Sequence, residues 1–583
     1  MSKRYLMLLA ICLLIGDIVY SQDLENLDLK TKAGNFFSGF TDAKPFQISG
    51  TMGLNMRSYN AFDTENRQAP FIWHLHSHLN ISIYKLKIPV SALISSQNQT
   101  ISHPFHRETF DNFKQQRFTR IGASPYYKWI KLHAGHRSMN FSPFTVANHT
   151  YLGAGIELTP GNIRFATFYG GMAKTQPRDL SLLGLNREIF NRKGLGVKAG
   201  YGTNKNFIDF ILFKGKDDPN QIDPINQDSS FIFQNDNAVL GINGQVTLFK
   251  RLNLRMEIAS SGFTKNAIDP ETEGTNPPIP NFLLNQRTST VYRQAINAGL
   301  SFDATLFTVG MGYRRIEPDY QSLGAYFFNN DLEDYTLNLG FGLLNNRLHF
   351  NGTGGLQKNN LFGEKATQLN RTIASANINY AVKTFTAGLS LSNYSSAVDY
   401  VLNLEQDSLN AIIVTQSASL NTSYMHLSEL KNRHLFSFNF SIQEVTDDVD
   451  NPSVSAASQM INAIVAYNFT PSESAWKFNS RINYNRNELS RIRVHRYGLG
   501  LGVERKLIAD KWFLSLQSNY FYSTGENIDN QTLSLRMSSP FRINKHHRID
   551  FSLLYLNRLS SSNNTVGGGF QEVTGILNYV YSF

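Results

Sequence analysis

Cysteine is almost absent from this chain of 583 residues, in which Cys12 is the only one. It lies in an apolar stretch from Tyr5 to Ile15 that follows Lys3 and Arg4. If that stretch is removed, disulfides, thiolate metal sites and cysteine nucleophiles are all excluded. No other apolar run is long enough for a membrane-spanning helix, which needs about 20 residues, so no such helix is predicted.

The first residues follow the order of a secretory signal. A charged pair precedes the apolar stretch, and Val19-Tyr20-Ser21 places fairly small residues where a signal peptidase cuts. We therefore predict a signal peptide over 1–21 and a mature N-terminus at Gln22. The alternative is a short N-terminal anchor, which the length of the apolar stretch disfavours.

Concentrated charge and linkers are also missing. The formal net charge is +10 and the pI about 9.3, but lysine and arginine are spread along the sequence without a basic helix or tail. This distribution argues against nucleic acid as a partner. No segment rich in proline or serine divides the chain, so we expect one long domain.

Strict alternation of apolar and polar residues is the main feature that is present. Over 71–81 nearly every odd position is apolar and most even positions are polar, and the pattern recurs over 252–258, 335–341, 436–442 and 549–553. Alternation places the two kinds of side chain on opposite faces of a strand. A soluble barrel or sandwich would need an enormous core to bury so much apolar surface. A transmembrane barrel instead turns the apolar face to lipid and the polar face to a watery lumen.

The lengths of the connections support the membrane alternative. Short links such as Tyr84-Lys85 and Asn345-Asn346-Arg347 alternate with long polar segments such as 216–235 and 263–289. Outer-membrane barrels have short periplasmic turns and longer extracellular loops in this way. We predict an all-β, antiparallel, up-and-down transmembrane barrel of about 26 strands (24–26) over 46–583. A short periplasmic or lumenal segment over 22–45 precedes it.

Two of the predicted connections can be tested individually. A link at 124–127 is expected between strands over 115–123 and 128–137. The proline-containing loop 269–280 is expected to fold over the mouth of the barrel, to meet a partner or to be mobile.

The last strand resembles a known assembly signal. Gly575, Leu577, Tyr579, Tyr581 and Phe583 share one face of it. This pattern is similar to the C-terminal signal of Gram-negative outer-membrane β-barrels. The resemblance implies that Tyr579, Tyr581 and Phe583 are read by the barrel assembly machinery, and that the protein lies in the outer membrane, in contact with its lipid. The tyrosine- and asparagine-rich strands, together with Gln22, resemble barrels of the Bacteroidota.

The polar face of the strands predicts a mostly basic lumen, relieved by Glu257 and Asp550. Such a lining raises the local concentration of anions or binds an acidic partner surface. The alternative is charge that only keeps the lumen compatible with water. The candidate lining residues are Arg57, Lys87, Lys131, Arg137, Arg255, Lys477, Arg481, Arg496, Arg536 and Arg548.

Three histidines on one strand are a possible metal site. His74, His76 and His78 share the lumen-facing side, and imidazole is a common ligand of Zn, Cu and Ni. A straight strand spaces them about 7 Å apart, too far for one ion unless a neighbouring strand or loop contributes. A polar lumen wall is the simpler interpretation.

Signs of an enzyme or of a bound cofactor are lacking. Gly498, Gly500 and Gly502 stand at strand spacing with no helix after them, so they are not a phosphate-binding loop, and we expect small residues on the lumen side. No Ser-His-Asp set or carboxylate pair can be assembled from the sequence. We therefore predict neither an enzyme nor a cofactor.

Two functions remain. The first is a porin-like channel for small polar or anionic solutes, which predicts stepwise conductance from the purified protein. The second is a structural or translocation component of a multiprotein outer-membrane complex, with a protein partner in the lumen or at the extracellular loops. A ring of this predicted size would otherwise leave a wide opening, because porins of 16–18 strands already enclose channels.

Overall fold

The computed structural model describes residues 39–96, 119–173, 190–218, 234–272, 277–325, 329–365, 367–400, 411–447, 457–489, 492–526, 528–560 and 569–583. The predicted signal peptide over 1–21 lies outside these residues, as do residues 22–38 of the predicted N-terminal segment. Both remain predictions.

The described residues form one sheet of 27 strands and a 3-10 helix. The first half contains η2 (Phe40–Asp42), β1 (Gln47–Phe62), β2 (Phe71–Ile83), β3 (Leu86–Ser95), β4 (Arg120–Ala123), β5 (Tyr126–Tyr127), β6 (Ile130–Asn140), β7 (Ala147–Leu158), β8 (Ile163–Ala173), β9 (Arg192–Gly202), β10 (Phe207–Asp217), β11 (Asp236–Leu248), β12 (Leu252–Thr264) and β13 (Thr290–Asp303). The second half contains β14 (Phe307–Ile316), β15 (Leu332–Leu343), β16 (Leu348–Lys358), β17 (Thr367–Ala381), β18 (Phe385–Tyr400), β19 (Ala411–Leu427), β20 (Arg433–Asp447), β21 (Ser458–Thr470), β22 (Trp476–Leu489), β23 (Ile492–Ile508), β24 (Trp512–Gly525), β25 (Ile528–Arg542), β26 (His547–Ser560) and β27 (Phe570–Ser582).

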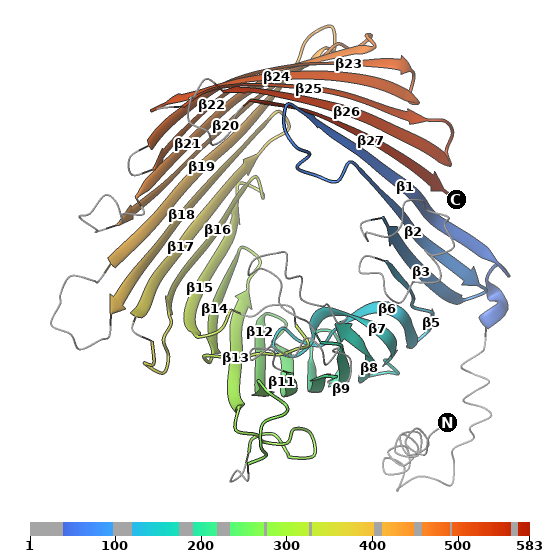
Figure 1. Ribbon diagram of the computed structural model, residues 1–583, viewed down its shortest axis with the longest axis vertical. Helices are drawn as coiled ribbons and strands as arrows, with labels where there is room; N and C mark the ends of the chain where they lie inside the picture. The colour runs from blue at the N-terminus through green and yellow to red at the C-terminus, as the bar shows by residue number, and fades with distance from the viewer. Residues whose placement is uncertain are drawn as a thin grey trace.

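The sheet closes on itself. β1 pairs antiparallel with β2 and also with β27, so the two ends of the sheet meet (Figure 1). Reciprocal backbone hydrogen bonds of 3.0 and 3.1 Å between Gly50 and Phe583 extend this seam. β4 and β5 both lie between β3 and β6, so the 27 strands occupy 26 positions around the ring. The predicted antiparallel barrel of 26 strands is confirmed.

One predicted strand boundary, at the fourth position of the ring, is wrong. A link was expected at 124–127, but β5 continues the strand through Tyr126 and Tyr127, and only Ser124-Pro125 interrupts it. Pro125 has no N–H to donate to a ladder, which is why the pairing breaks there. The turn into β6 lies instead at Lys128 and Trp129, where Lys128 has a φ of 50°.

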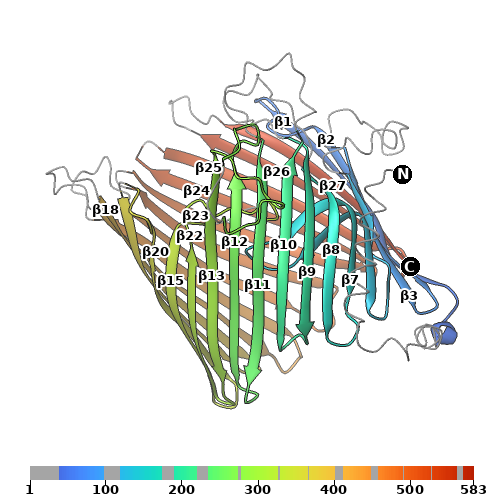
Figure 2. The same cartoon turned by 90° about the horizontal axis from the view of Figure 1, so that it is seen from below.

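Short and long connections lie at opposite ends of the barrel, as expected. Figure 2 shows the tight turns along its lower edge, and the strand ends that flank the longer connections lie along its upper edge. We call these the periplasmic and the extracellular end. Helix η2 lies at the periplasmic end, where the Phe40 ring packs 5.5 Å from Tyr84 and 5.3 Å from Tyr127. Among the described residues no helix is long and apolar enough to cross a membrane.

The outer face carries an apolar band with an aromatic girdle. Met311, Val465 and Ile482 on this face are 61%, 52% and 63% exposed. Aromatic pairs from neighbouring strands follow the periplasmic edge of this band, for example Phe341–Phe350 at 4.7 Å and His547–Tyr581 at 4.7 Å between ring centroids. This order of apolar band and girdle is that of a barrel in a bilayer.

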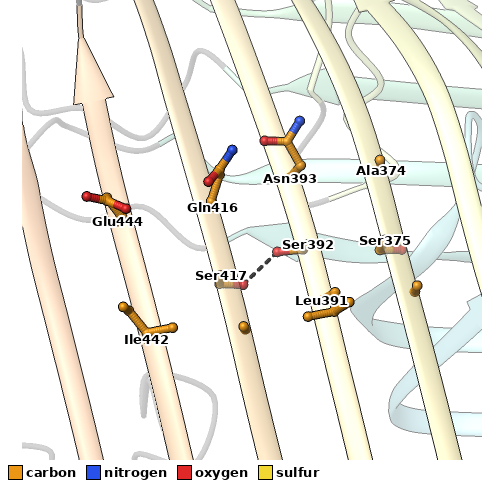
Figure 3. A pocket seen from close by; sticks show the side chains of 11 residues that line it. Ala374, Ser375, Leu391, Ser392, Asn393, Gln416, Ser417, Ile442 and Glu444 are labelled. Carbon is orange, nitrogen blue, oxygen red and sulfur yellow. Dashed lines mark hydrogen bonds between the residues drawn. The ribbon is translucent and has the colours of Figure 1, made fainter.

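The extracellular edge of the band is visible on β18, β19 and β20. Asn393, Gln416 and Glu444 stand opposite one another in register and form one polar row. Figure 3 shows this row, with Leu391 and Ile442 on the periplasmic side of it. The change from aliphatic to polar side chains within two residues marks where the apolar band ends.

The inner wall over β6–β15, ten of the 26 ring positions, is largely apolar, which the sequence interpretation did not anticipate. Two loops fold into the ring and pack on β6–β15, and they bury Phe144 and Val146 (β6–β7 loop) with Tyr320 and Leu323 (β14–β15 loop). Strands there carry apolar residues on both faces, as in 210–213 of β10. The predicted polar lumen is therefore wrong for this part of the wall, because the two loops shield it from water.

The β12–β13 loop packs on the outer wall of the barrel and not inside the ring. Ile279 and Leu284 are 0% and 1% exposed and pack on Ala238 of β11. A Cβ atom at Gly262 of β12 would lie 2.6 Å from Cδ2 of Leu284, so this glycine lets the loop lie flat. Ala238 and Gly262 are in register and share the outward face with the exposed Ile242 and Ile258. Figure 1 shows the β12–β13 segment outside the ring. The expectation that 269–280 folds over the mouth is wrong for the described residues, which cover the outer wall.

Candidate pore lining

The inner wall from β16 to β27 is polar and is not covered by the two infolded loops. On β22–β26 the outward positions are apolar and exposed, including Ile482, Leu499, Leu516 and Leu535. The alternate positions point into the lumen, because successive side chains of a strand face opposite ways. Asparagine, serine and arginine dominate these inward positions, as the sequence alternation predicted.

A glycine track on β23 shapes this wall. Gly498, Gly500 and Gly502 face the lumen, and a side chain from a neighbouring strand lies over each of them. A Cβ at Gly498 would lie 2.5 Å from the Phe521 ring, and one at Gly500 would lie 2.6 Å from Cγ of Arg481. The track therefore keeps neighbouring side chains flat on the wall rather than across the lumen. The expectation of small lumen-side residues at these positions is confirmed.

Four arginines descend the same wall on consecutive rungs. Arg496 lies on the first rung, and Arg558 is in register with Gly498 through Phe521 and Thr532. Arg481 pairs with Gly500 on the third rung, and Arg536 lies on the fourth, in register with Gly502. Rungs two residues apart are roughly 7 Å apart along a strand. We call these four residues the arginine ladder.

The ladder side chains are held in place without carboxylates. Nη2 of Arg481 donates to Oδ1 of Asn519 at 2.6 Å, and the Arg496 guanidinium stacks on Phe521 at 4.1 Å from the ring centroid. Within the described parts of the chain none of the four forms an ion pair. Their positive charge is therefore not cancelled locally.

Most lumen carboxylates, in contrast, are paired with cations; Glu257 is an exception and is buried beneath the β6–β7 loop. Glu504 accepts from Lys477 at 2.6 Å, and Asp550 accepts from Arg548 at 2.8 Å. The same holds on other strands, where the pairs are Lys131–Glu157 at 2.9 Å, Arg164–Asp209 at 2.7 Å, Arg192–Asp217 at 2.7 Å and Arg314–Asp334 at 2.5 Å. The unpaired charge of the described lumen wall is thus mainly positive.

The remaining predicted lining residues face inward but stand apart. Arg137 donates to Oγ of Ser91 at 3.0 Å and is thereby fixed to the wall. The Lys87 ammonium lies 5.9 Å from the centre of the Tyr126 ring. Arg57 lies on β1 at the seam, and Arg255 is exposed on β12, two residues from buried Glu257. Of the ten predicted residues, only Arg481, Arg496 and Arg536 come together in one array.

The three predicted histidines lie on the inner face of β2, one per rung. Nδ1 of His74 lies 3.0 Å from Oγ of Ser95, and the His76 ring lies over Gly53 of β1. Among the residues that the structure describes, no group of three or more potential ligands could hold a metal ion. Within these described residues the three histidines have no converging ligands.

Sequence reasoning missed two features: Arg558, and the hydrogen bonds that hold the infolded loops in place, which we call the latch. Arg558 lies one residue past the expected end of its strand, and the alternation 548–550–552 would have placed it in the lumen if continued. The latch is formed by Glu257, whose Oε1 accepts from the backbone N–H of Phe144 at 2.9 Å. Tyr320 reinforces it by donating to the carbonyl of Phe144 at 2.7 Å. No local pattern marks a contact between such distant segments.

Closed ring, outward apolar band, aromatic girdle and polar inner wall together define the class of this protein. Only a closed barrel satisfies all strand backbone groups in hydrocarbon. The chain is a transmembrane β-barrel of the outer-membrane type.

Comparisons with known proteins add no closer relationship. No protein-family model and no curated protein matches the chain. Among solved structures it is similar to the P pilus usher (PapC) translocation pore, at 10% identity over 92% of this chain and 99% of that one, with a TM-score of 0.36. It is also similar to Pseudomonas aeruginosa OccK10 (OpdN), at 10% identity over 64% and 98%, with a TM-score of 0.33. It is similar as well to the anion-selective porin from Comamonas acidovorans, at 10% identity over 49% of this chain and 93% of that one, with a TM-score of 0.25. These similarities are too weak to support a functional assignment. The assignment to the class of transmembrane β-barrels therefore rests on the strands of this chain.

Proposed function

We propose that this barrel is a porin-like channel for small polar solutes that favours anions. The observation that supports this proposal is the arginine ladder: four guanidinium groups on consecutive rungs without carboxylate partners among the described residues. Apart from the buried Glu257, the lumen carboxylates listed above are each neutralised by a cation. Excess positive charge on the wall raises the local concentration of anions.

The spacing of the ladder suits passage rather than tight binding. An anion that leaves one guanidinium meets the next one rung further along the wall and three or four strands away, so successive Cα atoms of the ladder lie roughly 16–20 Å apart. In a watery lumen the attraction between unit charges at 4 Å is about 1 kcal/mol, so a solute is drawn in but not retained. Amide groups such as Asn519 and Gln517 line the same rungs and replace water around a polar solute.

The test is conductance of the purified full chain in planar bilayers under a salt gradient. The proposal expects stepwise openings and a reversal potential of the sign that anion preference gives. A silent bilayer would refute the channel, and a reversal potential of the opposite sign would refute the anion preference.

The second candidate is a component of a multiprotein complex with a partner in the lumen or at the extracellular loops. Its support is the size of the ring, because 26 positions exceed the 16–18 strands of porins. Among the described residues, the infolded loops cover β6–β15 and not the opposite wall, where a partner could bind. Crosslinking followed by purification in mild detergent tests this candidate, which expects a stoichiometric companion. A monomeric, conducting barrel would exclude it.

A further inference from the structure

Three lysines form a patch on the outer wall near the extracellular end. Lys193 of β9 and Lys214 and Lys216 of β10 share the outward face with Phe210, which is 55% exposed. Toward the extracellular end, Lys193 is the next outward-facing residue after Leu195 on β9. Lys214 is the next outward-facing residue after Leu212 on β10. The patch therefore starts where the apolar band ends, just as Glu444 follows Ile442 in Figure 3.

The patch has an unfavourable internal arrangement. Lys193 and Lys216 are direct cross-strand partners, and like charges that stand opposite each other in a sheet repel. Lys193 reaches Asp218 at 3.5 Å and Lys214 pairs with Asp236, but the exposed Lys216 has no ion pair within the described ranges. Three ammonium groups thus share two carboxylates. An external anion would relieve this repulsion.

An apolar surface lies beside the lysines. The outer lobe, which we define as residues 265–272 and 277–289 of the β12–β13 loop, covers the outer wall next to β11. Its Ala267 N–H donates to the carbonyl of Gln234 at 2.8 Å, two residues before Asp236. The next residue, Ile268, is 69% exposed, and Phe282 of the same lobe is 85% exposed. Both side chains belong to a lobe on the wall that faces the membrane.

We propose that the lysine patch and the outer lobe together bind a phosphorylated glycolipid of the outer leaflet. The phosphate is held by Lys193, Lys214 and Lys216 through charge-assisted hydrogen bonds. The acyl chains run along the apolar surface that Ile268 and Phe282 provide. Cations at the edge of an apolar band match a lipid whose charged head adjoins its chains, which a free phosphate ion does not need. This inference is independent of the proposed channel function.

The test measures lipid on the purified full chain. The barrel is extracted in mild detergent and bound glycolipid per protein is quantified by mass spectrometry, before and after incubation with phosphorylated lipid A. Parallel samples receive the same lipid after removal of its phosphates, or inorganic phosphate alone. The K193Q/K214Q/K216Q variant is compared with K205Q/K250Q/K511Q, which removes three exposed lysines from periplasmic turns.

Wild type and the periplasmic control should bind phosphorylated lipid equally. The patch variant should lose on the order of tenfold or more in affinity, since each lysine near an anionic lipid contributes severalfold. F282S should weaken binding of both lipid forms. Heat-modifiable gel mobility confirms that each variant is a folded barrel. Equal binding by the patch variant, equal binding of dephosphorylated lipid, binding of inorganic phosphate in place of the lipid, or a stoichiometric protein on the lobe would each overturn the proposal.

Discussion

The hydroxyl of Tyr59 donates a 2.6 Å hydrogen bond to the Glu572 carboxylate, between residues that are 513 apart in the sequence. Tyr59 is 2% exposed, on β1, and Glu572 lies on β27, so the bond crosses the seam that closes the ring. Arg67 of the β1–β2 loop pairs with the same carboxylate, and this hydrogen bond raises the pKa of the Arg67 guanidinium.

The seam bond predicts a loss of stability on Tyr59→Phe. A buried hydrogen bond to a charged group contributes roughly 1.5–3 kcal/mol, so the midpoint of heat-induced unfolding should fall. Heat-modifiable gel mobility measures that midpoint. Tyr169→Phe, at a position 56% exposed, is the matched control and should behave as wild type. Equal midpoints for the two variants would contradict this role for the seam bond.

Deletion of Tyr581–Phe583 should block assembly. The deletion removes the aromatic end that resembles the assembly signal, and also the two backbone hydrogen bonds between Phe583 and Gly50 that extend the seam. Immunoblots of outer-membrane fractions measure the outcome, with Phe583→Trp as a control that keeps a terminal aromatic residue. Normal barrel levels after the deletion would refute the signal.

Release of the infolded loops should change the conductance. Glu257→Ala removes the acceptor for the Phe144 N–H, whereas Glu257→Gln keeps an oxygen at that position. We expect a larger or noisier single-channel conductance for the alanine variant and near-normal behaviour for the glutamine variant. If alanine leaves the conductance unchanged, the loops do not narrow the lumen.

Acid should loosen the loops around Asp331, which is 3% exposed. Burial raises the pKa of this carboxyl, but its hydrogen bonds with Lys365 and with the backbone of Leu361 and Asn360 outweigh burial and leave it below its ordinary 3.8. A lowered pKa stabilises the fold above the unfolded value, and the stabilisation disappears as the pH falls through the folded value. The contribution of Asp331 to the unfolding midpoint should therefore stay level near neutral pH and be lost as the pH falls below 3.8, and Asp331→Asn should remove this component. A fall that begins above pH 5 in wild type alone would contradict the assignment.

Local pattern was enough to predict the ring but not what folds onto it. Alternation along each strand fixes which side chains face lipid, so Arg481, Arg496 and Arg536 could be placed in the lumen from the sequence. The infolded loops could not be found, because apolar residues on both faces of β10 show that something covers them without showing what. The outer lobe was missed for a related reason: Ile279 and Leu284 are isolated apolar residues in a proline-containing loop, and their partner Ala238 belongs to another strand. Arg558 was not predicted, because the predicted strand ended at residue 557 and β26 extends to Ser560.

Anion preference through the arginine ladder is tested most directly by the reversal potential of the R481Q/R536Q variant beside wild type under the same potassium chloride gradient. The matched control is K205Q/K250Q, which removes two exposed lysines from the periplasmic turns between β9 and β10 and between β11 and β12. Wild type and control should both show a reversal potential of the sign that anion preference gives, and the ladder variant should shift toward zero at similar conductance. An unchanged reversal potential in the ladder variant would contradict anion preference through the arginine ladder.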